Sequence, residues 1–184
     1  MTAITINAPA DRVWRALTTP SLIKQWLFGV DTKSDWKKGS PIVHTGEWKG
    51  KAYEDKGVIL EIEPSAKLVH SHWSSMSGRP DRPENYEKIT YRLKERNGAT
   101  ELTIDEENIA SAEQRSASEE SWKKALGGLK ALVEKGQISD LRQRLVQVSD
   151  YVGHILDAHR QPHDIWPRTG GPALIDGELA VRRR

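Results

Sequence analysis

Apolar and polar residues alternate along several short stretches of the chain. Over Thr2–Asn7, two isoleucines alternate with polar residues, and a longer stretch, Glu87–Glu95, shows the same period with apolar positions at Ile89, Tyr91 and Leu93. Strands with one buried face and one face in water have this period of two. The alternation therefore predicts an antiparallel sheet that covers a core on one side.

Further strands are predicted at Gly57–Glu63, Lys67–Ser74 and Thr100–Asp105. In the first of these, the period of two places three apolar residues on one face: Val58, Leu60 and Ile62. The dipeptide Asn97-Gly98 stands between two alternating runs, and this arrangement is the strongest short-range signal for a β-hairpin. The pattern of residues between positions 31 and 105 therefore predicts a β-sheet.

Helical spacing precedes and follows these strands. Pro9 opens a short helix, and Thr19-Pro20 ends it and begins a second. A long helix is predicted from a capping box at Ser116–Glu119 to Gly136, where a left-handed terminal residue is expected. One face of that helix carries Trp122, Leu126, Leu129 and Val133. Gly127-Gly128 lie in its middle and predict room for the sheet or a ligand to approach.

Four stretches stand in a recognisable order over residues 1–136. They are Ile4–Pro9 with Val13–Thr18, Leu22–Gly29, Glu63–Val69, and Ser121–Leu132. In this order and spacing the chain resembles the bacterial Aha1-like family, named for the activator of the Hsp90 ATPase. That family belongs to the START/Bet v 1-like superfamily, also called SRPBCC or polyketide cyclase-like.

The resemblance implies an α+β helix-grip fold, in which an antiparallel sheet wraps around the long C-terminal helix and two short helices close one end. A cavity that often takes an apolar small molecule lies between sheet and helix in this superfamily. Its members include lipid carriers, hormone-binding proteins, cyclases and co-chaperone domains, and they share no catalytic residue. Fold alone therefore leaves function open.

Two kinds of binding function follow from the resemblance: a non-catalytic domain for a small hydrophobic molecule, or a co-chaperone-like domain for a protein partner. The alternative is an enzyme of the cyclase or hydrolase type that uses the same cavity. The sequence holds none of the common hydrolase motifs, so we predict no catalytic residue and no cofactor. An enzyme would need a polar side chain inside the cavity with a partner that shifts its pKa.

The residues predicted to line the cavity are mainly aromatic: Trp26, Phe28, Trp48, His70, His72, Tyr91 and Trp122. The two histidines are two positions apart on a strand and share one face, either the cavity or the outer surface. Zinc needs three or four ligands, and no third ligand is evident beside them, so no metal site is predicted.

Composition narrows the classes of function. The 184 residues carry a formal net charge of +2 and include seven tryptophans but no cysteine. The near balance of charge argues against nucleic-acid binding, and no apolar run is long enough to span a membrane. A chain without cysteine has no disulfide, and we expect a cytoplasmic protein.

Composition also changes at Gly136, because every lysine lies before it. We therefore predict a helix-grip domain over residues 1–136, an amphipathic helix over 137–160 and an extended or disordered tail over 161–184. The helix carries a heptad seam: Ile138, Leu141, Leu145, Val148, Val152 and Ile155. Either Ser139 caps this helix, or it continues from the long helix through Gly136. Its partner is either the domain itself or a second subunit, and the polar outer face of the sheet favours a homodimer.

Overall fold

The computed structural model describes residues 1–160, and it describes side chains for residues 1–136. In chain order the elements are β1 (Thr2–Ile6), α1 (Ala10–Thr18), α2 (Pro20–Trp26), β2 (Asp31–Ser34), β3 (Pro41–Trp48), β4 (Lys51–Glu63), β5 (Lys67–Ser74), the 3-10 helix η1 (Pro83–Asn85), β6 (Glu87–Arg96), β7 (Ala99–Glu107) and α3 (Ala112–Arg160). The contacts divide the chain into Met1–Arg142 and Gln143–Arg184, and every strand belongs to the first unit. The predicted tail and the side chains of the seam lie outside the described residues.

All seven strands form one antiparallel sheet in the order β1-β7-β6-β5-β4-β3-β2. The predicted hairpin joins β6 to β7, with Arg96 paired to Ala99. Asn97 and Gly98 have φ angles of 52° and 75°. Two successive positive φ angles define the tight turn that matches the twist of the flanking strands, so the Asn-Gly prediction is confirmed.

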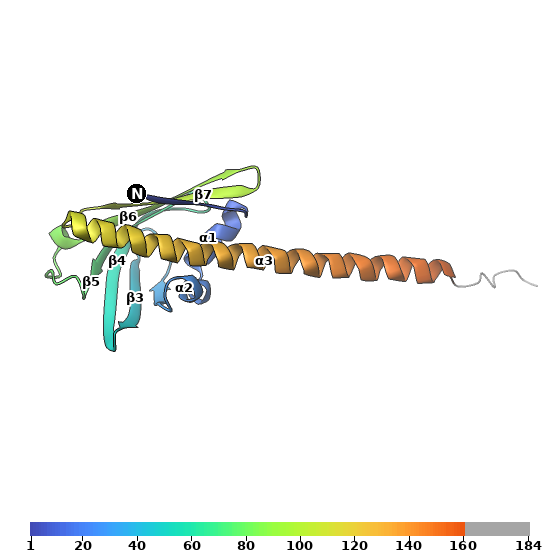
Figure 1. The fold of residues 1–184 in the computed structure, drawn as a ribbon, viewed down its shortest axis with the longest axis horizontal. Helices are drawn as coiled ribbons and strands as arrows, with labels where there is room; N and C mark the ends of the chain where they lie inside the picture. The colour runs from blue at the N-terminus through green and yellow to red at the C-terminus, as the bar shows by residue number, and fades with distance from the viewer. Residues whose placement is uncertain (161–184) are drawn as a thin grey trace, which may run out of the picture. The chain divides into compact units, whose positions relative to one another are not determined.

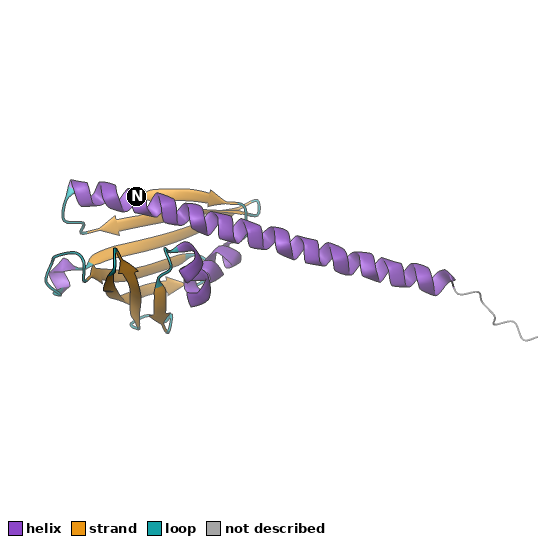
Figure 2. Ribbon diagram, turned by 60° about the horizontal axis from the view of Figure 1, so that its bottom comes forward, coloured by secondary structure: helices purple, strands orange, loops and turns teal. Residues whose placement is uncertain are grey.

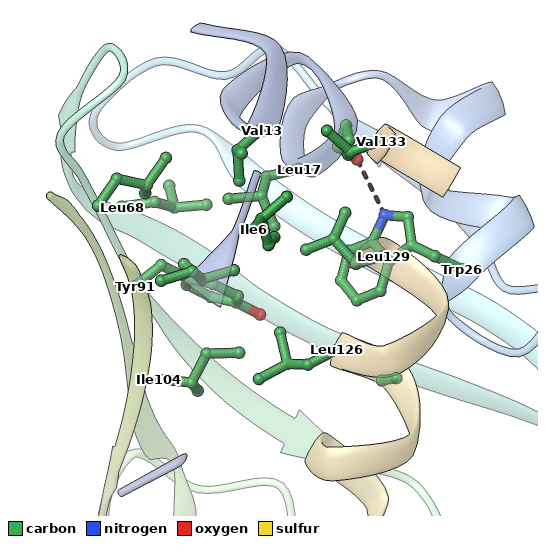
Figure 3. Packing of buried hydrophobic residues seen from close by; sticks show 14 of the residues in the cluster. Ile6, Val13, Leu17, Trp26, Leu68, Tyr91, Ile104, Leu126, Leu129 and Val133 are labelled. Carbon is green, nitrogen blue, oxygen red and sulfur yellow. Dashed lines mark hydrogen bonds between the residues drawn. The ribbon is translucent and has the colours of Figure 1, made fainter. Parts of the chain in front are cut away.

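The first part of α3 lies across one face of this sheet (Figures 1 and 2). Leu126, Leu129 and Val133 are 4% exposed or less, and they belong to the same buried cluster as Leu102 and Ile104 of β7. Figure 3 shows Leu126 of the helix and Ile104 of the sheet facing one another. The predicted apolar face of the long helix and the helix-grip fold are therefore confirmed.

The two short helices pack beside α3, and their contact depends on a tryptophan and a glycine. Trp26 at the end of α2 donates from Nε1 to the carbonyl oxygen of Ala16 in α1, at 2.9 Å (Figure 3). A Cβ atom on Gly128 would lie 3.3 Å from the Trp26 carbonyl oxygen, whereas one on Gly127 would contact nothing. The space predicted at this glycine pair therefore receives α2 rather than the sheet.

The prediction that Val58, Leu60 and Ile62 share one face is wrong. Val58 and Leu60 are 40% and 41% exposed, and Ile59 between them is fully buried. The pairing of β4 with β5 shifts register between Ile59 and Glu61, and Ile62 beyond this irregularity packs against the core. A β-bulge interrupts the period of two, so alternation on one side does not continue on the other.

The predicted ends of the long helix are also wrong. The helix begins at Ala112 rather than after Ser116, because Ser111 supplies the first cap by accepting the Gln114 N–H on Oγ at 3.2 Å. It does not end at Gly136, which has no positive φ angle, but continues to Arg160. No proline follows until Pro162, and a single glycine costs a helix only about 1 kcal/mol against alanine.

Two glycine substitutions test this packing in opposite directions. A Cβ on Gly57 would lie 1.6 Å from the Ser71 carbonyl oxygen, so Gly57→Ala should lower the free energy of unfolding by about 1–3 kcal/mol. Gly127→Ala is the control, because its Cβ meets only open space, and it should raise stability by about 1 kcal/mol. Urea unfolding followed by tryptophan fluorescence measures both. A Gly57→Ala protein as stable as the parent would contradict the close approach of β4 and β5.

Candidate functional site

A cavity of about 170 Å³ lies within the first unit. Its apolar and aromatic wall comes from Leu27, Phe28, Val30, Ile89, Tyr91 and Trp122, and its polar wall from His44, Tyr53, Asp55, His70 and His72. A smaller cavity of about 20 Å³ shares Leu27, His44, His70 and Tyr91 with it. The shared residues therefore stand between two parts of one site.

Four rings cross the site from the sheet to the long helix. The centroids of His44 and His70 are 6.4 Å apart, and the His70 ring stacks on Tyr91 at 5.8 Å with an angle of 22° between the planes. Tyr91 in turn meets the edge of Trp122 at 5.8 Å and 87°. Both are geometries that aromatic pairs favour. The row starts on β3, passes through β5 and β6, and ends on α3.

Glu106 of β7 holds the helical end of this row in place. Its Oε1 accepts from Trp122 Nε1 at 2.8 Å, and its Oε2 accepts from Ser118 Oγ at 2.5 Å. Hydrogen bonds to an ionised carboxylate are about twice as strong as neutral ones. The Trp122 ring is therefore fixed by a strand residue, and its orientation in the cavity wall is set before any ligand enters.

His70 is buried, with 2% of its surface exposed, and it lies neutral in the wall. Its Nδ1 is 2.9 Å from the backbone carbonyl oxygen of Ser71, which can only accept a hydrogen bond. Nδ1 therefore carries the proton, and Nε2 is left as an acceptor. Burial lowers the pKa of His70 to about 3, so the ring stays neutral at physiological pH.

His44 is neutral as well, and its hydrogen-bond partner is a hydroxyl. Its Nδ1 lies 2.9 Å from Thr32 Oγ1 on the neighbouring strand β2. Burial, with a further contribution from the charge on His72, lowers the pKa of His44 to about 4. Two neutral imidazoles thus stand side by side on the cavity wall.

His72 has the opposite state because two carboxylates flank its ring. Its Nε2 is 3.6 Å from Asp55 Oδ2, and its Nδ1 is 3.4 Å from Glu87 Oε2. Burial alone would lower the pKa of His72, but the two carboxylates outweigh it and raise the pKa to about 9. The second oxygen of Asp55, Oδ1, is buried and has no hydrogen-bond partner.

The structure brings five of the predicted cavity residues together: Phe28, His70, His72, Tyr91 and Trp122. Phe28 is 65% exposed, so most of its ring faces solvent while one side borders the cavity. Trp26 lines the smaller cavity instead. Trp48 is 56% exposed at the end of β3 and lines neither cavity.

Three polar residues of the wall were missed in the sequence: His44, Tyr53 and Asp55. They lie on β3 and β4, where Asp55 pairs with His44 and Tyr53 pairs with Gly46. The signal that could have found them is the turn at Lys49-Gly50, where both residues have positive φ angles. A hairpin centred on that turn sets the register of β3 against β4. Among the described residues, no group of three or more acidic or histidine side chains is placed to hold a metal ion.

Comparison with known proteins agrees with the fold. A sequence model of the family described as "Activator of Hsp90 ATPase homolog 1-like protein" matches residues 7–134. The chain belongs to this family, and its fold is that of a superfamily of ligand-binding and polyketide cyclase-like proteins. No curated protein matches the sequence. The described residues contain no helix long and apolar enough to cross a membrane.

Solved structures extend the comparison. ChR145 from Cytophaga hutchinsonii is 42% identical, with a TM-score of 0.63, and the match covers 75% of this chain and 95% of that one. CalU16 from Micromonospora echinospora is 25% identical, with a TM-score of 0.56 and 71% of each chain covered. DynU16, from the dynemicin biosynthetic locus, is 20% identical over 73% of this chain and 46% of its own, with a TM-score of 0.61. At that identity the likeness to DynU16 shows the fold alone.

The state of His72 makes stability depend on pH. Its pKa is about 6.5 in an unfolded chain and about 9 here, so its ion pairs stabilise the fold fully below pH 6.5. That stabilisation is lost as the pH rises through 9. The free energy of unfolding should therefore exceed that of His72→Gln most below pH 6.5, by a few kcal/mol, and the two should converge above pH 9. Urea unfolding of both proteins between pH 6 and 10 measures the difference. A difference that does not change with pH would contradict a charged His72.

Proposed function

We propose that this protein binds a small, mainly apolar molecule in the cavity between the sheet and α3. The observation that carries the proposal is the cavity itself, about 170 Å³ of space that the surrounding aromatic side chains do not fill. A dry engineered cavity of about 150 Å³ is large enough to take benzene. The site is therefore of a size to take a ligand with about one ring.

The placement of the tryptophans supports a ligand site over a solid core. Trp26 packs against α1 and Gly128, and Glu106 holds Trp122 in the wall. Neither ring occupies the central space. A domain that binds only a protein partner, as a co-chaperone does, has no use for an open cavity. If the tryptophan rings filled the cavity, the protein-binding function would be favoured. The open cavity therefore favours a small molecule over the protein partner that the family name suggests.

An enzyme acting in the same cavity is the second candidate. His70 and Tyr91 lie inside, and His72 has partners that shift its pKa, as acid–base chemistry requires. Both nitrogens of His72, however, face carboxylates, so its protons are already engaged. His70 has a pKa of about 3, far below the range that suits a general base at neutral pH. Binding is therefore the better supported of the two functions.

Native mass spectrometry of the full chain, purified from its host, tests the binding function. We expect a small molecule to be retained by the parent protein and lost from Val30→Phe, because Val30 lines the cavity and the larger ring occupies it. Leu60→Phe is the matched control, since Leu60 is 41% exposed and lies outside the cavity. Thermal melting shows that both variants fold. A folded Val30→Phe protein with full occupancy would place the ligand elsewhere.

The same measurement separates binding from catalysis. Asp55 is the carboxylate of the wall with an unpaired oxygen, so Asp55→Asn removes the strongest candidate base at nearly constant shape. For a binding protein, the molecule retained by Asp55→Asn should have the same mass as that retained by the parent. A different mass would mean that the variant traps a substrate which the parent converts, and it would favour the enzyme.

We further propose that residues 1–136 act as the ligand-binding domain and that the helix over residues 137–160 joins two copies of the chain. The backbone is helical through Arg160. The apolar residues between Ile138 and Ile155 recur every three or four positions. Apolar residues repeated at this spacing form the seam of a coiled coil, which buries them against an apolar partner. A twofold dimer supplies one, with the same seam on each copy.

Light scattering of the full chain at tens of micromolar tests the dimer. The parent should have the mass of two chains, and Leu145→Asp should have the mass of one, because it places a charge in the seam. Gln143→Asp is the control, since position 143 falls on the opposite side of the heptad, and it should remain dimeric. A monomeric parent protein would rule out the dimer and leave the ligand site untouched.

A further inference from the structure

The hydrogen-bonding groups of the cavity wall are unevenly divided between donors and acceptors. If the cavity binds a ligand, as proposed above, this unevenness constrains the chemistry of that ligand, and the constraint rests on the proposed binding function. Burying a polar group without a partner costs roughly 1–3 kcal/mol, so a ligand is favoured when it completes the hydrogen bonds that the wall leaves open. The hydrogen-bonding groups of the wall that lack a partner therefore indicate which complementary groups the ligand carries.

The most fully determined of these groups is Nε2 of His70. The Ser71 carbonyl oxygen holds the proton on Nδ1, and burial keeps the ring neutral. No described residue donates to Nε2. The His70 ring is held between Tyr91 and His44 and borders both the larger and the smaller cavity. A ligand in the cavity therefore finds a hydrogen-bond acceptor of fixed position, His70 Nε2, next to the stacked rings.

A second acceptor is the carboxylate of Asp55. Its Oδ2 faces His72, and its Oδ1 is buried with no partner. The hydroxyl of Tyr91 also has no partner among the described residues, but it can donate or accept and so fits either kind of ligand group. His70 Nε2 and Asp55 Oδ1 can only accept a hydrogen bond. A ligand that satisfies them therefore carries a hydrogen-bond donor.

The charges around the site point the same way. Asp55, Glu87 and Glu106 lie at or next to the wall, and the imidazolium of His72 is the cation among them. Among the described residues that line either cavity there is no lysine or arginine. A buried anion needs a cationic or N–H-rich partner, and the cation of this wall, His72, already faces Asp55 and Glu87 with its two ring nitrogens, so an incoming carboxylate or phosphate finds no free cationic partner among the described residues of the wall.

We propose that the ligand is a small planar molecule, about one aromatic ring in size, that carries an N–H or O–H donor and no negative charge, and that His70 Nε2 accepts its hydrogen. The rings of Tyr91 and Trp122 supply the flat apolar walls that such a molecule stacks against. His70 is then the residue that distinguishes a donor-bearing ring from a plain hydrocarbon.

Three probes of similar size test this: phenol carries the donor, toluene lacks it, and benzoate carries the negative charge. Their dissociation constants are measured by NMR titration of the full chain and of His70→Phe, which keeps a ring on Tyr91 but removes the acceptor. The ratio of the toluene constant to the phenol constant cancels the hydrophobic contribution of the ring. We expect that ratio to fall about tenfold in His70→Phe, which is the size of one lost hydrogen bond. Benzoate should not bind the parent protein.

A second measurement needs no variant. The ¹⁵N resonance of His70 Nε2 in the parent protein should shift on addition of phenol and stay in place on addition of toluene. An equal affinity ratio in both proteins, a resonance that does not respond to phenol, or tight binding of benzoate would each overturn the inference while leaving the cavity a binding site. Failure of all three probes to bind the parent protein would count against the binding function itself.

Discussion

The separation between α3 and the sheet decides where side chains fill the space between them and where a cavity is left. Toward the short helices, Leu129 and Val133 pack into the buried cluster. Toward the start of the helix, the two hydrogen bonds of Glu106 fix α3 through polar contacts instead of apolar ones. A carboxylate bridge between strand and helix sets their separation without filling the space behind it, so the cavity persists beside a well-packed core.

The three histidines of the wall show how strongly neighbours determine the state of one residue type. Among the residues whose side chains are described, His44 and His70 have no carboxylate on either ring nitrogen, and burial keeps both neutral. His72 lies between the carboxylates of two neighbouring strands and is charged. Since its two ring nitrogens are both engaged, His72 serves to orient Asp55, and His70 is the imidazole that still has a free nitrogen. Chemistry in this cavity therefore follows from the partners of each ring.

The β4–β5 pairing shows a similar dependence on local irregularity. Ser71 Oγ accepts the backbone N–H of Val58 at 2.9 Å, and Gly57 allows the Ser71 carbonyl oxygen to approach where any side chain would collide. Val58 and Leu60 face outward on either side of Ile59, and the register shift after Ile59 brings Ile62 to the core. This irregularity lies beside His70 and His72, so the strand that carries both cavity histidines is positioned by a departure from regular pairing.

The sequence alone determined the class of fold, because local periodicity and turn chemistry carry that information. The buried positions Ile89, Tyr91 and Leu93, the Asn97-Gly98 turn and the apolar face of α3 each have a local physical cause and were confirmed. Thr90, on the strand face expected in water, is buried instead. The resemblance to the Aha1-like family added the helix-grip arrangement, which the family match supports. Periodicity could also place His70 and His72 on one face of a strand, although it could not say which face.

Tertiary structure decided what sequence periodicity could not. The bulge in β4 depends on its pairing with β5, as at Ser71, and the start of α3 depends on the cap at Ser111. The polar wall depends on the register of β3 against β4, which brings His44 opposite Asp55. Proton positions on the histidines depend on atoms supplied by other residues, such as the Ser71 carbonyl oxygen and the Asp55 carboxylate. A pattern of residue types records which faces are apolar, whereas hydrogen bonds and charges act between atoms that only the folded chain brings within a few ångströms.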